Sequence, residues 1–496
     1  MKTWRKRIVV MLTVMCLTLS GCSQDTISDT DDHITLRVAA EMEEEGPAKH
    51  LTNQINYWIT KFEKAHPNVD VVIDDITPTE MYIGEHRTAD ELSLNQITKE
   101  RLQTELMAGK GPDILLLSTD QVWIALNMVF PNRNLLLPDI NLAMRNGLFY
   151  DISAFYDADT ALGKEGLLTT VMDAGVIDGK RFVLPLRYNL LTAYVDTKAF
   201  EESGLSPDIF DQDIISVFDA ITQHDDRDIA SAAYIQSSEE CELNLIGNLI
   251  DYDNQEVLVT TAELADYFRA KQECGITATG GSVPRGATMS DYCEDPSSNW
   301  IRSGKGMFIA DLDYAIDSAV IANAEGVELG MYPLKSTDGS VTAGITLFGG
   351  VTRGSKHPEL AYEFLRYFLS EEAQWEQVSS RGNQNWLAGN GWPVRAKGAM
   401  SALTERNGIK DSIFAIALDG KDTVTAADIP VFTDEDMPVL DVAIDNARFP
   451  TTLEDDFQDI VVYNQYKMTA AEARSMDLDA LAESFIQKLE WHLGEG

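Results

Sequence analysis

The stretch WITKFEKAHPNVDVVI, residues 58–73, joins a helical pattern of apolar residues directly to a strand pattern. Apolar residues recur at helical spacing upstream of it and within it, which predicts one amphipathic helix over residues 51–62. Pro67 ends this helix, because proline lacks the backbone N–H and disfavours helix in the residue before it. The run VDVVI, residues 69–73, then predicts a strand.

Another strand is predicted just before this helix, and the same order of elements returns later. Apolar residues alternate in HITLRVAA, residues 33–40, as they do in a strand. A helix is predicted over 92–108, followed by glycines that suit a helix end. The run ILLL, residues 114–117, has the uniform apolarity of a strand covered on both faces. Strand–helix–strand units build a parallel sheet with helices on its faces, so we predict the α/β class.

Later segments add further helices. Apolar residues over 360–368 mark one face of a helix, and those over 478–489 mark one face of a terminal helix. Capping boxes are predicted at two positions, Thr260 with Glu263 and Thr469 with Glu472, and the second should open the terminal helix.

The N-terminal segment has the charge order and length of a secretory signal. Four basic residues precede an apolar run over residues 8–19, which is too short to span a bilayer. The Ser-Gly-Cys sequence that ends at Cys22 resembles the lipobox of bacterial lipoproteins, in which the cysteine becomes the lipidated N-terminus. We therefore predict a lipoprotein signal peptide over residues 1–21, lipidation of Cys22 and an acidic tether over residues 22–33. An ordinary signal with an incidental cysteine is the alternative.

Charge and length narrow the class of ligand and the number of domains. The formal net charge is −41, and loss of the four basic signal residues leaves the mature chain near −45. Such a charge repels nucleic acids and other anions at long range and favours a neutral or cationic ligand. A chain of 496 residues exceeds one ordinary hydrophobic core, so we expect two domains.

The cysteines and histidines say little about disulfide bonds or metal sites. Cys241, Cys274 and Cys293 remain after the signal and the lipidation site, and their odd number allows one disulfide at most. No cofactor or metal is expected, because the seven histidines are scattered and no paired metal-ligand spacing occurs. The acidic stretch DYDNQE, residues 251–256, lacks the glycine of a calcium-binding loop, which favours a solvated loop.

Six segments, in the same order along the chain, resemble bacterial extracellular solute-binding proteins of the carbohydrate-uptake type, relatives of the maltodextrin-binding proteins. They are WITKFEKAHPNVDVVI (58–73), LQTELMAGKGPDILLL (102–117), DGKRFVLPLRYNLLTAYVDTKAFEESGL (178–205), SGKGMFIADLDYAI (303–316), GSKHPELAYEFLRYFLSEEAQ (354–374) and NGWPVR (390–395). Two departures concern the ligand. Val195 and Asp196 stand where a Tyr-Asn-Lys motif would continue after Tyr194, and Asp313 stands where relatives often have a tryptophan.

The resemblance implies a periplasmic-binding-protein-like fold, in which a hinge joins two α/β lobes and the ligand cleft lies between them. The expected N-terminal lobe comprises residues 34–186 and 336–385. The expected C-terminal lobe comprises residues 187–335 and 386–496. A hinge of this kind lets both lobes close on one small molecule and bury it.

The candidate ligand site combines polar and aromatic residues, because a sugar presents hydroxyl groups and flat C–H faces. Such residues lie after predicted strands, where α/β sheets bind ligands, or in the segments that carry the resemblance. The candidates are Glu41, Asp120, Trp123, Arg187, Tyr188, Asn189, Asp311, Asp313, Tyr314, Trp386, Trp392 and Arg395. Each has a structural alternative: an aspartate can cap a helix, a loop tryptophan can anchor packing, and an arginine can pair with the many acids.

The resemblance implies a lipid-anchored binding component of an ABC importer on the extracytoplasmic face of the cell membrane. We expect a monomer that captures a mono- or oligosaccharide, delivers it to the permease, binds no nucleic acid and is not an enzyme. The chain contains no His-Glu-x-x-His, Gly-x-Ser-x-Gly or P-loop motif, and carboxylate pairs arise by chance in so acidic a chain. Two alternatives stay open: the same fold with a non-sugar polar or cationic ligand, and a secreted glycan-active hydrolase.

Overall fold

The computed structural model of the chain describes most of the predicted α/β elements. The described residues are 33–42, 49–76, 89–118, 136–137, 139–223, 235–236, 242–274, 307–312, 322, 326–374, 391–395, 443–451, 453, 457 and 476–494. The predicted signal and Cys22 lie outside them. Within the described residues, no helix combines the length and the apolar character that crossing a membrane requires.

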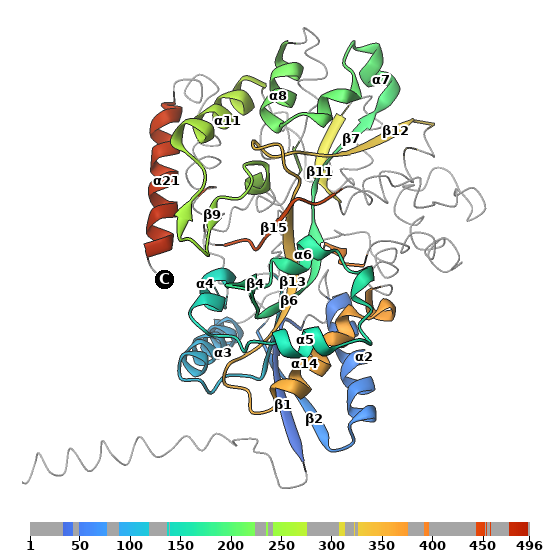
Figure 1. Ribbon diagram of the computed structural model, residues 1–496, viewed down its shortest axis with the longest axis vertical. Helices are drawn as coiled ribbons and strands as arrows, with labels where there is room; N and C mark the ends of the chain where they lie inside the picture. Colours follow the sequence, from blue (N-terminus) through green and yellow to red (C-terminus); the bar gives the residue numbers. More distant parts are fainter. Residues whose placement is uncertain are drawn as a thin grey trace, which may run out of the picture.

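The larger sheet has seven strands and forms the core of one lobe, in the lower half of Figure 1. Its order is β14-β6-β13-β3-β1-β2, and β15 pairs with β13. The strands are β1 Ile34–Ala40, β2 Val69–Asp75, β3 Ile114–Ser118, β6 Val183–Asn189, β13 Thr342–Val351, β14 Trp392–Pro393 and β15 Asn446–Arg448. The helices are α2 Lys49–Ala65, α3 Ala89–Met107, α4 Ile140–Arg145, α5 Ser153–Ala158, α6 Thr169–Asp173 and α14 Pro358–Arg366, and the short hairpin is β4 Val176–Ile177 with β5 Lys180–Arg181.

A smaller sheet of order β12-β7-β11-β8 forms the core of the second lobe, in the upper half of Figure 1. Its strands are β7 Leu191–Asp196, β8 Ile235–Gln236, β11 Met307–Asp311 and β12 Leu329–Pro333. The helices are α7 Thr197–Glu202, α8 Ile214–Gln223, α11 Thr261–Cys274 and α21 Leu478–Gly494. A hairpin of β9 Ile250–Asp251 and β10 Glu256–Val257 lies beside α21.

The opening strand–helix–strand unit forms where the apolar pattern predicted it. Ile55, Trp58 and Phe62 are buried on one face of α2, which ends at Ala65, two residues before Pro67. Strand β3 is buried on both faces, because Leu115 and Leu116 point to opposite sides and neither is exposed. These predictions are confirmed.

The later helices follow the same logic. Apolar residues between Ala361 and Phe368 are buried on one face of α14 and the turn after it. The predicted capping box before α11 forms: Thr260 N donates to Glu263 Oε2 at 2.8 Å, and Glu263 N donates to Thr260 Oγ1 at 3.3 Å. Helix α21 begins at Leu478, whereas the other predicted box, Thr469 with Glu472, lies outside the described residues.

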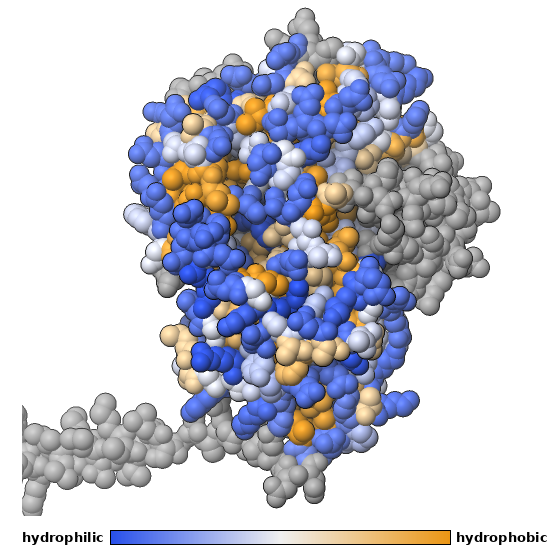
Figure 2. All heavy atoms as spheres, in the orientation of Figure 1, coloured by the Kyte–Doolittle hydropathy of each residue, from blue (hydrophilic) through white to orange (hydrophobic). Residues whose placement is uncertain are grey.

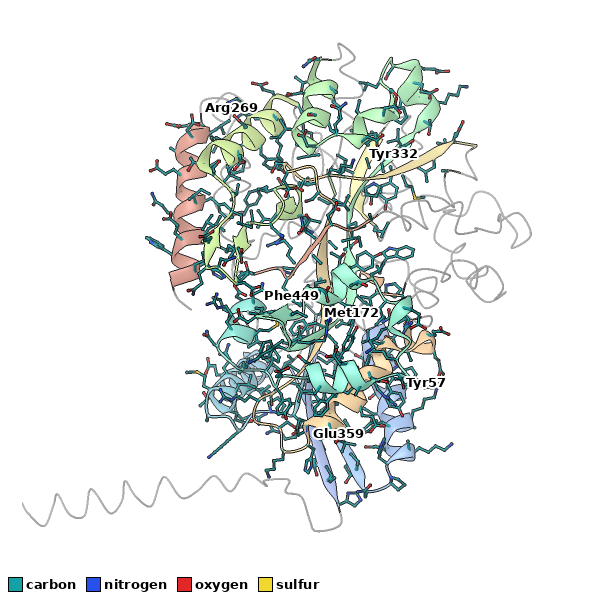
Figure 3. All side chains as sticks on the ribbon, in the orientation of Figure 1. Tyr57, Met172, Arg269, Tyr332, Glu359 and Phe449 are labelled. Carbon is teal, nitrogen blue, oxygen red and sulfur yellow. The ribbon has the colours of Figure 1, made fainter. Side chains whose placement is uncertain are left out.

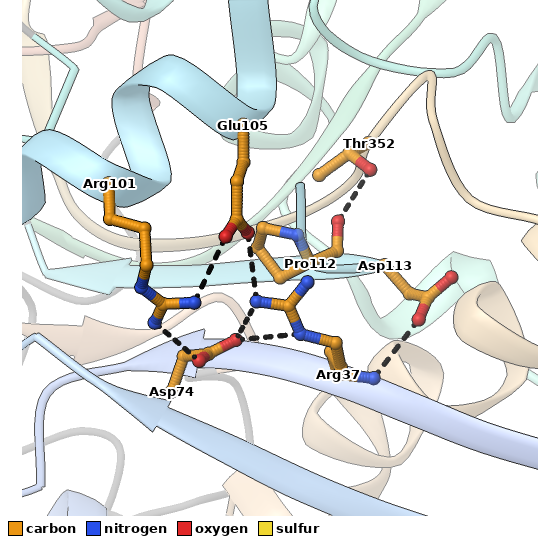
Figure 4. Close-up of polar contacts among 7 residues, drawn as sticks. All are labelled: Arg37, Asp74, Arg101, Glu105, Pro112, Asp113 and Thr352. Carbon is orange, nitrogen blue, oxygen red and sulfur yellow. Dashed lines mark hydrogen bonds and ion pairs between the residues drawn. The ribbon is translucent and has the colours of Figure 1, made fainter. Parts of the chain in front are cut away.

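An ion-pair network holds α3 against the first two strands (Figure 4). Arg37 Nη2 on β1 lies 2.8 Å from Asp74 Oδ2 on β2 and 3.0 Å from Glu105 Oε2 on α3. Arg101 pairs with the same two carboxylates, at 3.0 and 3.1 Å. Burial alone would lower the pKa of Arg37, but the charges and hydrogen bonds of Asp74 and Glu105 raise it above its ordinary value. The network is therefore structural and stays charged.

The chain passes from the larger sheet to the smaller one at Leu190. Strand β6 ends at Asn189 and β7 begins at Leu191, and Leu312 N donates to Leu190 O at 2.8 Å. A second passage lies between the end of β12 and the start of β13. A third passage follows β15, which pairs with β13 in the larger sheet, and leads to α21 in the second lobe. These passages connect the two lobes.

The sheets divide the chain at slightly different positions from the expected lobe boundaries. Residues 187–189, expected in the C-terminal lobe, are the end of β6 in the larger sheet. Residues 392–393, also expected there, pair with β6 as β14, and 446–448 pair with β13 as β15. A strand pattern predicts an element but not the sheet that the element joins.

The buried apolar residues form two clusters. The first contains those of β1, β3, β6 and β13 and extends into the second lobe through Tyr194, Ala310 and Met331 of the smaller sheet. The second contains those of α8, α11 and α21 with the other face of β7. Phe449 and Met172 belong to the first cluster and lie near the passage between the lobes (Figure 3). Hydrophilic residues cover most of the coloured surface in Figure 2, and hydrophobic patches lie between them. Cys274 is buried, and Cys241 and Cys293 lie outside the described residues.

Candidate functional site

The carboxyl ends of strands from both sheets converge at the passage through Leu190. In the larger sheet, β1, β2 and β3 are parallel, and β6 runs in the same direction because both β3 and β6 are antiparallel to β13. In the smaller sheet, β11 and β12 run opposite to β7 and end beside its first two residues. Open α/β sheets bind ligands beyond the carboxyl ends of their strands, so this junction is the candidate site.

Polar residues lie at these strand ends. Glu41 follows β1 directly and is partly exposed, and Asn189 ends β6. Asp311 ends β11 and pairs with Leu191 at the start of β7. The topology therefore brings three of the predicted site residues to one junction.

Ser118 is a further polar residue at this edge, and the sequence reasoning missed it. It ends β3 and donates from Oγ to Thr346 O on β13 at 3.3 Å. Its signal in the sequence was its place directly after ILLL, one residue beyond the apolar run. A serine in that place offers a hydroxyl group to a ligand at the same edge as Glu41 and Asn189.

Arg187 is buried below the edge and orients a second residue that the sequence reasoning missed. Its side chain is on β6, and Nη2 donates to Gln54 Oε1 on α2 at 3.1 Å. Gln54 is only 6% exposed, and its Nε2 has no hydrogen-bond partner. The indole Nε1 of Trp58, one turn later on α2, has none either. Two buried N–H donors of α2 are therefore unpartnered, and one of them belongs to the Gln54 amide that Arg187 contacts.

Tyr188 and Trp392 form a cross-strand pair with almost no exposure. Trp392 pairs with Tyr188 between β14 and β6, and their exposed fractions are 0% and 1%. The indole Nε1 of Trp392 donates to Leu312 O at 2.9 Å, which ties β14 to the segment after β11. Gly391 has a φ of +74°, and a Cβ there would lie 2.7 Å from Tyr188 O, so the chain needs glycine before the tryptophan. In this conformation Trp392 anchors packing at the passage between the lobes.

Two other candidates also make local structural contacts. Asn189 is 1% exposed, and its Oδ1 accepts a hydrogen bond from Leu190 N at 3.0 Å. Arg395 donates to three carbonyls: Nε to Leu369 O at 2.7 Å, Nη1 to Gly163 O at 2.8 Å and Nη2 to Leu162 O. Burial lowers the pKa of Arg395, and nearby acidic groups oppose that shift. Because Arg395 already serves backbone carbonyls, we leave it out of the proposed contacts.

The remaining candidates fall outside the described residues, or only their backbone is described. Asp120, Trp123, Asp313, Tyr314 and Trp386 are outside them, so their roles stay predictions. Among the described residues, no group of three or more His, Cys, Asp or Glu side chains is arranged to hold a metal ion.

The comparisons with known proteins agree with this geometry. The model of the family described as bacterial extracellular solute-binding protein matches residues 95–385, which is more than half of the chain. No curated protein matches it in sequence.

Solved structures share the fold at low identity. The sugar-binding protein MalE of Xanthomonas citri is similar with a TM-score of 0.54 and 12% identity, over 93% of this chain and 98% of that one. The galacto-N-biose- and lacto-N-biose I-binding protein of an ABC transporter from Bifidobacterium longum, in complex with lacto-N-biose, gives 0.52 and 15%, over 94% and 99%. A designed cysteine esterase gives 0.54 and 14%, over 94% and 99%, so this fold alone does not separate binding from catalysis.

The family match and the two sheets joined at Leu190 lead to the same assignment. The chain belongs to the bacterial extracellular solute-binding proteins and has their periplasmic-binding-protein-like fold of two α/β lobes.

Proposed function

We propose that this protein is the binding component of an ABC importer and captures a carbohydrate between its two lobes. The observation that carries the proposal is the convergence of strand ends from both sheets at Leu190. A ligand at this junction touches both lobes, so it stabilises a closed conformation through the contacts that only closure provides.

The residues at the junction suit the hydroxyl groups of a sugar. Glu41 and the Ser118 oxygen offer acceptors for the hydroxyl groups of a sugar, and Asp311, whose backbone ends β11 at the same junction, is the third proposed contact. The predicted aromatic contacts, Trp123, Tyr314 and Trp386, complete the proposed site with ring faces for C–H surfaces. The related proteins whose descriptions name a ligand bind sugars, which supports the same class here.

The proposal extends to location and partners. Lipidation of Cys22 anchors the mature chain on the extracytoplasmic face of the membrane. The acidic tether is a flexible spacer that separates the two lobes from the membrane surface. The partner is the permease of the importer, which receives the ligand from a monomeric binding protein. Two experiments test this anchor. Protease added to intact cells should digest the protein, because it lies on the outer face of the membrane. Radiolabelled lipid should be incorporated into the native chain but not into Cys22→Ser.

A cationic or other polar solute is the second candidate, and the charge of the chain favours it. The net charge is −41, and Glu41 follows β1 directly at the junction. A carboxylate at a closing interface attracts a polyamine as readily as it accepts hydroxyl protons.

Thermal unfolding with a ligand panel separates the candidates. The mature chain is heated with neutral mono- and oligosaccharides and, separately, with polyamines. A specific sugar that raises the melting temperature without forming a product supports the proposal; at 100 times Kd, ligand linkage adds about 2.7 kcal/mol. A rise with polyamines alone moves the ligand to the cationic class, and release of a shorter glycan reveals a hydrolase.

Variants then place the ligand at the junction. Ser118→Ala and Glu41→Gln should each weaken binding of the sugar found in that panel by about 1–3 kcal/mol, because the first removes and the second weakens an acceptor that lobe closure would bury against the ligand. Ser370→Ala is the matched control, since the Ser370 Oγ also donates to a backbone carbonyl, Tyr367 O, at 2.7 Å but away from the junction. Equal affinity in both junction variants would remove this edge from the site.

A further inference from the structure

We propose that Gln54, oriented by Arg187, binds a carboxylate group of the ligand, so that the captured carbohydrate is an acidic sugar such as a uronic acid. The inference rests on the proposed function and narrows its ligand from carbohydrates in general to those that carry a carboxylate. Gln54 lies outside the six segments that carry the family resemblance and is not one of the candidate residues predicted from the sequence.

The hydrogen bond from Arg187 fixes the orientation of the Gln54 amide. Arg187 Nη2 donates to Gln54 Oε1 at 3.1 Å, and the two residues are 4% and 6% exposed. A guanidinium group has donors and no acceptor, so the amide oxygen, not the amide nitrogen, has to face it. Nε2 therefore keeps its N–H donors, and among the described residues nothing accepts a hydrogen bond from it.

A second buried glutamine, which contacts the same strand, has its whole amide paired. Gln374 is 2% exposed, and its Nε2 donates to Leu186 O on β6 at 3.2 Å and to Phe368 O at 2.8 Å. Its Oε1 accepts from Arg395 N at 3.1 Å. The fold thus pairs both ends of this amide but only the oxygen of Gln54. A buried donor without an acceptor destabilises the folded chain, so the unpaired Nε2 indicates a functional role as a donor.

The available donors favour a carboxylate over a hydroxyl group. Gln54 Oε1 already accepts from Arg187, and the unpaired Nε1 of Trp58, one turn later on the same face of α2, is also a donor. A hydroxyl group bound by such residues would need an acceptor for its own proton, whereas a carboxylate only accepts. The positive charge of Arg187 adds to the attraction, because hydrogen bonds to ionised groups are stronger than neutral ones.

The place of Arg187 on β6 puts this amide next to the candidate ligand site. Arg187 is two residues before Asn189, which ends β6 at the junction of strand ends. A uronic acid carries hydroxyl groups and a carboxylate on one ring, so the same molecule supplies hydroxyl groups to Glu41 and Ser118 and a carboxylate to Gln54. The net charge of −41 repels anions at long range, so the attraction has to come from these short contacts.

The test compares acidic sugars with their neutral counterparts on the mature chain. Glucuronic and galacturonic acid and their oligomers are set against glucose, galactose and the corresponding neutral oligomers in thermal unfolding. Calorimetry then measures Kd for each sugar that binds. We expect the melting temperature to rise more with an acidic sugar than with its neutral counterpart at the same concentration.

Gln54→Glu tests the contact itself. It keeps an oxygen for Arg187 but replaces the unpaired N–H donor with an oxygen that repels a carboxylate. Affinity for the acidic sugar should fall about 10- to 100-fold. The ligand-free melting temperature should not fall, because the hydrogen bond to Arg187 becomes an ion pair. Gln54→Met removes the donor without adding a charge, so it should also weaken binding, and it decides the question if the glutamate variant misfolds.

Gln374→Glu is the matched control. It places a carboxylate against the carbonyls of Leu186 and Phe368, so it should lower the ligand-free melting temperature but leave the ratio of affinities for acidic and neutral sugars unchanged. The inference is overturned if acidic sugars raise the melting temperature no more than neutral ones, or if Gln54→Glu binds an acidic sugar as tightly as the native chain does. A rise with neutral sugars alone would leave the proposed capture of a carbohydrate intact, whereas a rise with polyamines alone would remove it.

Discussion

Some polar side chains near the passage between the lobes make only structural hydrogen bonds, and others are candidates to contact the proposed ligand. Arg395 and Arg187 are both arginines close to the passage between the lobes, yet their surroundings differ. All three guanidinium nitrogens of Arg395 donate to backbone carbonyls, whereas Arg187 donates to Gln54, whose own amide N–H remains unpaired. Arg395 therefore links separate backbone segments, whereas Arg187 contacts a glutamine that has an unpaired N–H group.

Arg395→Ala tests the structural assignment of this residue. It leaves the carbonyls of Leu162, Gly163 and Leu369 without their donor, so we expect a loss of about 1–3 kcal/mol in the free energy of unfolding. Urea unfolding measures it, with Lys198→Ala as a control for loss of an exposed cation, whose Nζ lies 3.8 Å from Glu202. A loss no larger than that of the control would return the Arg395 guanidinium to the candidate ligand contacts.

At the scale of elements, the turns that carry the chain between the sheets are held by short polar contacts. The turn between β12 and β13 is an example. Asp338 Oδ1 accepts from Ser336 Oγ at 2.6 Å, from Ser340 Oγ at 2.6 Å and from Ser340 N at 2.9 Å. Burial acts against the charged form, but these hydrogen bonds outweigh it and hold the pKa of Asp338 below its ordinary value of 3.8.

The charge of Asp338 makes the stability of this turn depend on pH. A carboxylate with a lowered pKa stabilises the folded chain above its unfolded value, and that contribution is lost as the pH falls through the folded value. The native chain should therefore be more stable than Asp338→Asn at pH 6, and the difference should shrink below about pH 4. Paired urea titrations at pH 6 and pH 3 check this, because the other titrating groups are common to both chains. A difference that does not change with pH would contradict it.

At the scale of the whole molecule, local sequence patterns predicted the helices and strands but not all the contacts between them. The helix that carries Trp58 and the strand ILLL were predictable, because the spacing of apolar residues and the position of Pro67 are local features of the sequence. That Trp392 joins the same sheet as Tyr188 was not, since sheet membership depends on contacts 200 residues apart. The contact between Asp139 and His492 was missed for the same reason, because it joins residues far apart in the sequence that only the fold brings together.

The helices of the second lobe should also unfold as their own unit, because α8, α11 and α21 share an apolar cluster separate from that of β1, β3 and α2. Lys271→Met tests this through the buried Lys271–Glu242 pair of the second lobe, in which each residue is 1% exposed and Tyr267 also donates to Glu242 at 3.0 Å. Removal of the lysine leaves a buried carboxylate without its counter-charge, which costs about 3–5 kcal/mol, and Glu242→Gln in the same chain should recover part of that loss.

Hydrogen exchange locates the damage that Lys271→Met causes. Amides of α8 and α11 should lose protection together, while those of β1, β3 and α2 keep theirs, because the two sets of elements pack in separate apolar clusters. Equal loss throughout the chain would mean that the passages couple the lobes into one cooperative unit. Such coupling would leave closure with less freedom than the proposed capture requires, since a hinge works only where two rigid bodies meet through a few residues.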